Sequence, residues 1–232
     1  MKLGGLQETS LLDYPGKISA IVWTVGCNFR CPFCYNSDLV FGTVKEISIE
    51  RLKDLLEKRK GKLDAVSITG GEPLLHEDIE DLIREIKSKG YLVKVDTNGT
   101  FPTRLKTLLD KKLIDYVSMD VKATKETYNT VAGVQVDLDS IESSIKLIQT
   151  HAPAYEFKTT VIPTYHTKKD IITIAQWLKG STQYYLQQFK TNTRLLSKEA
   201  ELVKPYTKKT LLDICTDIQP FFKHCSIRGI QP

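Results

Sequence analysis

Short apolar runs alternate with amphipathic stretches along most of the chain. The run Ile18–Thr24 is rich in β-branched and aromatic residues, which is typical of a strand. Leucines at helical spacing follow in Ile49–Lys58, and Ser48 before them is suited to cap a helix. Continued alternation predicts strands at Ala65–Thr69, Tyr91–Val95, Tyr116–Val121, Tyr155–Ile162 and Tyr184–Phe189, and helices at Asp78–Lys87, Thr103–Asp110, Leu138–Gln149, Asp170–Leu178 and Lys208–Phe222.

Six strand-then-helix units in strict order predict an α/β fold with a parallel sheet and covering helices. A closed eight-unit barrel takes about 250 residues, whereas this chain has 232 and a long first loop. We therefore predict an open, partial (β/α)6 barrel of the TIM type with helices outside. No linker rich in Pro, Gly or Ser divides the chain, so residues 1–232 are expected to form one domain, with a core at about 17–190 and a C-terminal helix at about 205–223.

The composition is that of an ordinary globular protein. There are 33 Lys and Arg against 28 Asp and Glu, a net charge of +5, and 41% of the residues are hydrophobic. These proportions exclude a disordered or collagen-like chain. The lysines are scattered along the sequence, which favours a solvated surface over a nucleic-acid-binding patch, and no nucleic-acid partner is expected.

The N-terminal segment does not resemble a secretory signal. It has no apolar core and already carries Glu8 and Asp13, unlike a secretory signal peptide. The longest stretch without a charged residue is Ile18–Phe29, which is shorter than the roughly twenty residues of a membrane-spanning helix. We expect a cytoplasmic protein with reduced cysteines and no membrane partner.

Polar residues follow each predicted strand. Ligands of parallel α/β proteins bind at the C-terminal ends of the strands, so these residues are expected to converge on one face. Only one of the two neighbouring glutamines of the last strand can point inward, because side chains alternate. The residues are, in strand order, Cys27, Cys31 and Cys34; Gly70 to Pro73; Asp96 to Gly99; Asp120 and Lys122; Thr159 and Thr160; and Gln187 and Gln188.

Three of the five cysteines stand close together in a C-x3-C-x2-C spacing. Three thiolates on a short loop can hold three irons of a cubane cluster and leave the fourth iron open for a ligand. A four-cysteine zinc module needs a second close pair, but Cys215 and Cys225 are ten residues apart and are expected to be buried thiols. A chance grouping of thiols, or a zinc site completed by a distant histidine, remains an alternative.

The cysteine spacing, with Phe33 in its last gap, and the Gly-Gly-Glu-Pro run after the second strand resemble two motifs of the radical S-adenosylmethionine superfamily. The resemblance implies one 4Fe-4S cluster and S-adenosylmethionine bound at its open iron. Cluster and cofactor would carry the chemistry without an acid or base residue. Taken alone, the glycine run also fits a strand-to-helix turn. The residues implied are Cys27, Cys31 and Cys34 on the cluster, Phe33 near the adenine, Gly70, Gly71, Glu72 and Pro73 at the methionine moiety, and Tyr35, Asp96, Asp120 and Lys122 around the cofactor.

A narrower resemblance comes from Gly5–Gln7 and Thr9–Lys17, which are similar to activating proteins of anaerobic ribonucleoside-triphosphate reductases and, more broadly, of glycyl radical enzymes. The loops after the third and fourth strands resemble those of pyruvate formate-lyase activating enzymes. That resemblance implies a monovalent cation at Asp96, Thr97 and Asp120. Local readings stay open: a β-turn at Asp13–Gly16, a core carboxylate at Asp120 and a surface lysine at Lys122.

These motifs imply an enzyme that reductively cleaves S-adenosylmethionine and removes a hydrogen from a glycine of a partner. The partner would be a glycyl radical enzyme, first of all anaerobic ribonucleoside-triphosphate reductase, and flavodoxin or ferredoxin would donate the electron. The alternatives are an activase of another glycyl radical enzyme, 7-carboxy-7-deazaguanine synthase, or a metal-binding module without catalysis.

Overall fold

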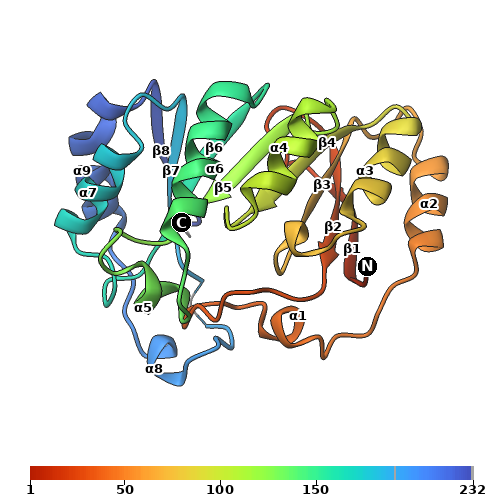
Figure 1. Cartoon of the computed structure of the whole chain (residues 1–232). Helices are drawn as coiled ribbons and strands as arrows, with labels where there is room; N and C mark the ends of the chain where they lie inside the picture. The colour runs from red at the N-terminus through yellow and green to blue at the C-terminus, as the bar shows by residue number, and fades with distance from the viewer. Residues whose placement is uncertain (191, 231–232) are drawn as a thin grey trace.

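One sheet organises the chain. The computed structural model describes residues 1–190 and 192–230, and within these ranges eight strands lie in the order β1 to β8. β1 is antiparallel to β2, and every later pair is parallel. Figure 1 shows the sheet curving around an open interior, with β1 and β8 at opposite edges and the longer helices outside. The predicted open, parallel α/β architecture is confirmed.

The strands are β1 (Leu3–Ser10), β2 (Ser19–Thr24), β3 (Ala65–Gly70), β4 (Leu92–Thr97), β5 (Tyr116–Asp120), β6 (Tyr155–Val161), β7 (Gln183–Gln188) and β8 (His224–Arg228). The helices are α1 (Ser37–Phe41), α2 (Ile49–Lys58), α3 (Ile79–Ser88), α4 (Pro102–Asp110), α5 (Tyr128–Ala132), α6 (Leu138–His151), α7 (Lys168–Trp177), α8 (Lys198–Glu201) and α9 (Lys208–Ile218), with 3-10 turns η1 (Pro73–Leu75) and η2 (Gln219–Phe221). Across the described residues, no helix is long and apolar enough to span a membrane.

The sheet contains two strands, β1 and β8, in addition to the six that the hydrophobic pattern predicts. β1 contains two glycines and four polar residues, so it lacks the composition of a strand. A methyl group at Gly4 would lie 2.4 Å from the Leu39 side chain, so glycine lets this edge strand pack under α1. β8 follows η2, and η2 lies where we predicted that the last helix continues to Phe222. Pro220 at the start of η2 marks the point where that helix ends.

The barrel interior is closed at the end opposite the cysteine loop. The buried ring of Tyr14 packs 5.6 Å from the ring of Tyr116 and joins Ala65 and Leu92, residues at the beginning of β5, β3 and β4. Its turn runs from Tyr14 to Lys17, with the Lys17 amide donating to the Tyr14 carbonyl over 3.2 Å. The predicted β-turn is therefore present one residue further along. Gly16 at its third position has φ of 70°, as a type II turn requires.

Candidate active site and cofactor cavity

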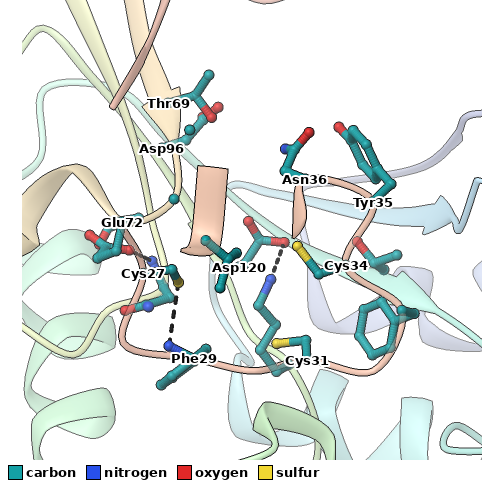
Figure 2. A pocket seen from close by; sticks show the side chains of 18 of the residues that line it. Cys27, Phe29, Cys31, Cys34, Tyr35, Asn36, Thr69, Glu72, Asp96 and Asp120 are labelled. Atoms are coloured by element: carbon teal, nitrogen blue, oxygen red, sulfur yellow. Dashed lines mark hydrogen bonds and ion pairs between the residues drawn. The ribbon is translucent and has the colours of Figure 1, made fainter. Parts of the chain in front are cut away.

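A cavity opens at the C-terminal ends of the strands. Its volume is about 970 Å³, including solvent at its mouth. Loops from across the chain line it together, as the strand-end rule predicts, and Figure 2 shows their side chains around one space. Among the expected residues, the lining includes Cys27, Cys31, Phe33, Cys34, Tyr35, Gly70, Gly71, Glu72, Asp96, Thr97, Asp120 and Lys122. Gly99, Thr159, Gln188 and Pro73 are not part of the lining, and Pro73 is buried at the start of η1.

The cysteine loop is held by its own arginine and by α5. The Arg30 guanidinium donates to the carbonyls of Cys27 and Phe29, both over 2.7 Å. The Arg30 amide donates to the Ala132 carbonyl over 2.8 Å. Gly133 follows immediately, and a methyl group there would lie 2.2 Å from the Arg30 carbonyl oxygen. The loop conformation therefore depends on contacts from a helix about a hundred residues further along the chain.

The three thiols share the cavity, and burial favours the protonated form of two of them, Cys27 and Cys31. Burial raises the pKa of Cys27 to about 11 and that of Cys31 to about 12, while the positive charge of Lys122 opposes both increases. The Phe29 amide donates to the Cys27 sulfur over 3.4 Å, an interaction that favours a thiolate. Binding of a metal must therefore displace protons.

This donor set fits an iron–sulfur cluster. Three cysteines from one loop, an amide donor at one sulfur and a lysine near another supply the ligands and the positive environment that anionic cluster thiolates require. In the part of the chain that the structure describes, no three His, Cys, Asp or Glu side chains are arranged to hold a single metal ion.

The glycine pair after β3 packs directly against the start of the cysteine loop. Gly70 has φ of 125°, and a methyl group there would lie 2.4 Å from the backbone of Thr24. At Gly71 the methyl group would lie 1.8 Å from the Gly26 carbonyl oxygen. The Glu72 amide donates to that same oxygen over 2.8 Å. The two glycines are therefore required by the fit of backbone to backbone, in addition to any contact with a ligand.

The Glu72 side chain connects two loops of the site. Only 1% exposed, it accepts hydrogen bonds from the amides of Leu74 and Asn98, over 3.0 and 2.6 Å, and from the Thr97 hydroxyl over 2.8 Å. Burial raises the pKa of Glu72 to about 7, against the effect of these three donors. The Asn98 amide group then donates to the Asn28 side chain over 2.8 Å, so the loops after β2, β3 and β4 form one bonded unit.

Charged residues on and after β4, β5 and β6 form another wall of the cavity. The Lys122 ammonium lies 3.2 Å from Asp120. Lys158 lies 3.6 Å from Asp120 and 3.8 Å from Asp96, and Lys94 also pairs with Asp96. Burial by itself would raise the pKa of Asp96, but Lys158 and Lys94 outweigh it and lower this pKa to about 2. Asp120 and Lys122 thus belong to the cavity, and the surface alternative for Lys122 is wrong.

Sequence reasoning missed two lysines of the cavity, Lys158 and Lys190. Lys158 stands two residues before Thr160, which also lines the cavity, so strand alternation was the signal that could have found it. Alternation does separate the glutamines as predicted: Gln187 lines the cavity, whereas Gln188 donates to the Tyr206 carbonyl over 2.7 Å.

Aromatic residues frame the cysteine loop. Phe33 is buried, with its ring 6.3 Å from the rings of both Tyr165 and His166. Tyr35 is 42% exposed, and the Lys190 ammonium lies 4.1 Å from the centre of its ring. Phe33 therefore has a fixed position inside the cavity, while Tyr35 lies at its rim.

His166 is a structural residue beside the site. Its Nδ1 accepts from the Ile162 amide over 3.2 Å, so Nε2 carries the proton and donates to the Lys122 carbonyl over 2.7 Å. Burial lowers the pKa of His166, so the ring stays neutral. This histidine fixes the backbone from which Lys122 extends.

The remaining two cysteines lie elsewhere. Cys215 on α9 and Cys225 on β8 are buried, with their sulfurs 2.9 Å apart, and neither lines the cavity. Their predicted position as buried thiols is confirmed.

Comparisons with known proteins identify relatives of the whole chain. The chain is 34% identical over 192 residues to a Methanocaldococcus jannaschii protein named "putative glycyl-radical enzyme activating enzyme", covering 81% of this chain and 79% of that one. It is 33% identical over 85 residues to 7-carboxy-7-deazaguanine synthase of Aquifex aeolicus, covering 37% of this chain and 38% of that one.

The fold matches the crystal structure of Streptococcus suis SuiB with a TM-score of 0.68 at 16% identity, covering 91% of this chain and 49% of that one. Residues 21–178, more than half of the chain, match the Radical SAM superfamily. The chain with three thiols around this cavity belongs to the radical SAM superfamily.

Proposed function

We propose that this chain is an activating enzyme for a glycyl radical enzyme, with a 4Fe-4S cluster on Cys27, Cys31 and Cys34. The observation that carries the proposal is the single cavity in which these thiols meet the Gly70–Gly71 backbone and Lys122. The relative from Methanocaldococcus jannaschii, which aligns with four fifths of the chain, supports the same class of reaction.

The cluster and S-adenosylmethionine together would supply one-electron cleavage of a C–S bond, which produces methionine and a 5′-deoxyadenosyl radical. The electron would come from reduced flavodoxin or ferredoxin. The radical would take a hydrogen atom from a glycine of the partner, so that 5′-deoxyadenosine forms and the unpaired electron remains on that glycine.

The residues of this chain would bind and orient the cofactor. The backbone of Gly70 and Gly71, which lines the cavity, would meet the methionine end, and Phe33 and Tyr35 would offer aromatic surface to the adenine. Asp96, Asp120 and Lys122 would surround the remaining polar groups of the cofactor. Glu72 and Pro73 would act by support: Glu72 ties the loops together, and Pro73 begins the turn behind them.

Within this class, we propose anaerobic ribonucleoside-triphosphate reductase as the partner, on the resemblance of the segment that ends in Gly16 and Lys17. β1 and β8 are the two edges of the sheet and are not paired with each other among the described residues. A loop of a large protein would enter the cavity through this open side. The alternative, 7-carboxy-7-deazaguanine synthase, is supported by a relative that aligns with 37% of the chain.

Anaerobic reconstitution with iron and sulfide tests the class of reaction. We expect a brown protein with a 4Fe-4S electron paramagnetic resonance signal after reduction, and 5′-deoxyadenosine from added S-adenosylmethionine. Cys31→Ala should lose the signal and the product, because it removes one of three ligands. Cys225→Ala is the matched control and should retain both, because Cys225 is a buried thiol outside the cavity.

A colourless zinc protein would indicate a metal-binding module without catalysis. Cluster binding and product formation by Cys31→Ala would contradict the ligand assignment.

A second experiment tests the partner. Mixing the reduced enzyme with the reductase should yield a glycyl radical doublet. Turnover of a small pterin substrate without that doublet would instead support the 7-carboxy-7-deazaguanine synthase alternative.

A further inference from the structure

The charged wall of the cavity bears on the monovalent cation that the resemblance implies at Asp96, Thr97 and Asp120. The Lys158 ammonium lies between the two carboxylates, 3.8 Å from an Asp96 oxygen and 3.6 Å from an Asp120 oxygen. Its strand β6 pairs with β5, where Lys158 is directly opposite Asp120. Strand register and alternation therefore bring this side chain to the carboxylates from the cavity face.

The third expected ligand is also committed elsewhere. The Thr97 hydroxyl donates to Glu72 over 2.8 Å and accepts from the Gly99 amide over 3.1 Å. A hydroxyl has one O–H and two lone pairs, so these two bonds leave the Thr97 oxygen a single lone pair for a metal ion. Because the Lys158 ammonium already lies between the two carboxylates, the side chains present do not fit a bound monovalent cation.

The local charge balance supports this conclusion. Asp96 and Asp120 carry two negative charges, and the three ammonium groups of Lys94, Lys122 and Lys158 pair with them. All five side chains are largely buried, at most 18% exposed, so these charges are weakly screened. An additional cation would be repelled by Lys158 and would find no unpaired carboxylate.

We propose that Lys158 is a positioning residue whose ammonium takes the place of a monovalent cation between Asp96 and Asp120. The chain then needs no bound potassium or sodium to hold these two carboxylates in the cavity. The part of this inference that concerns S-adenosylmethionine cleavage rests on the proposed function, whereas the part that concerns cation binding does not.

The test compares potassium chloride, sodium chloride and choline chloride at equal ionic strength. Melting temperatures of the cluster-free protein are measured first, because they require no radical chemistry. The wild type should melt at the same temperature in all three salts. Lys158→Ala removes the ammonium and opens space between the carboxylates, so potassium or sodium should raise its melting temperature by about 3 °C over choline.

The matched control is Lys106→Ala, which removes a lysine from an exposed carboxylate pair with Asp110 and should show no cation dependence. In the reconstituted enzyme, 5′-deoxyadenosine formation by Lys158→Ala should fall in choline and recover at least severalfold in potassium or sodium. Rescue by small cations but not by choline is a result that a general packing defect would not produce.

A wild type stabilised by potassium relative to choline would overturn the proposal. A folded Lys158→Ala variant with identical melting in all three salts would do the same. If Lys158→Ala does not fold, Lys158→Gln takes its place as a milder variant. The melting temperatures of the wild type in the three salts remain a separate test. Absence of 5′-deoxyadenosine in every sample would contradict the proposed function and leave the melting result valid.

Discussion

The loops after β2, β3 and β4 and the strands β6 and β8 build the same interior in different ways. In the loops, backbone meets backbone: Gly71 has no room for a methyl group beside Gly26, and the buried Glu72 holds amides of its own loop and the next. The strands instead contribute single charged side chains, Glu156 and Lys158 from β6 and Arg228 from β8. The structure of the loops therefore depends on close backbone packing, whereas that of the strands depends on paired charges.

Charge on these strands is fully paired. Glu156 is 1% exposed and accepts two bonds from the Arg228 guanidinium, over 2.7 and 2.8 Å. The Ser118 hydroxyl donates to it over 2.9 Å and the Tyr116 hydroxyl over 3.1 Å. Burial would raise the pKa of Glu156, but Arg228 outweighs that effect and lowers it. The comparison predicts that small changes of shape damage the loops, whereas the strands tolerate changes that keep charge balanced.

The largest effect is expected from Gly71→Ala. The new methyl group would lie 1.8 Å from the Gly26 carbonyl oxygen, so the two loops must separate. We expect loss of cluster incorporation and a marked loss of soluble protein, measured as iron and sulfide content per chain. Gly61→Ala is the control: φ is 75° there but no atom lies within 4 Å, so only backbone strain of about 1 kcal/mol is expected. Normal iron content in Gly71→Ala would contradict the importance of shape in this region.

A smaller effect is expected from Arg228→Ala. It leaves the Glu156 carboxylate buried without its bidentate partner, which costs about 3–5 kcal/mol for fully buried pairs. Because the Arg228 side chain is 35% exposed, we expect a loss of about 2 kcal/mol in the free energy of unfolding, measured by urea denaturation. Adding Glu156→Gln to this variant should recover most of the loss. If the double variant is less stable than Arg228→Ala, charge balance is not the controlling property.

The smallest effect concerns pH and His166, which donates a hydrogen bond to the Lys122 carbonyl. Its pKa is lowered by burial from 6.5, so the unfolded chain binds a proton near pH 6 that the folded chain does not. The stability contribution is complete above pH 6.5 and falls as the pH decreases. Between pH 7.5 and 5.5 the wild type should lose up to about 1.4 kcal/mol more than His166→Gln.

This difference isolates His166 because other titrating groups act in both proteins. Glu72, whose pKa is raised to about 7, contributes with the opposite sign, since its protonated folded form gains stability as the pH falls. Equal pH dependence in the wild type and in His166→Gln would show that the ring is not kept neutral in the folded chain.

Short-range patterns in the sequence determined much of this protein. Cys27, Cys31 and Cys34 are fixed on one loop by their spacing, and the glycine run and Asp96 follow strands that the hydrophobic pattern identifies. Residues close in sequence share a loop whatever the rest of the fold does. For that reason the six central strands, the open parallel sheet and most of the residues around the cavity could be predicted.

Only the tertiary structure decided how distant residues pair. Lys158 reaches Asp96 and Asp120 through strand register, and Tyr14 closes the far end of the barrel against Tyr116. These partners are tens of residues apart in the sequence. The local sequence pattern predicts which face of a strand a side chain occupies. The neighbouring strand and its register determine which residues that side chain contacts. A lysine that is unremarkable in the sequence thus becomes an internal cation only when three strands lie side by side.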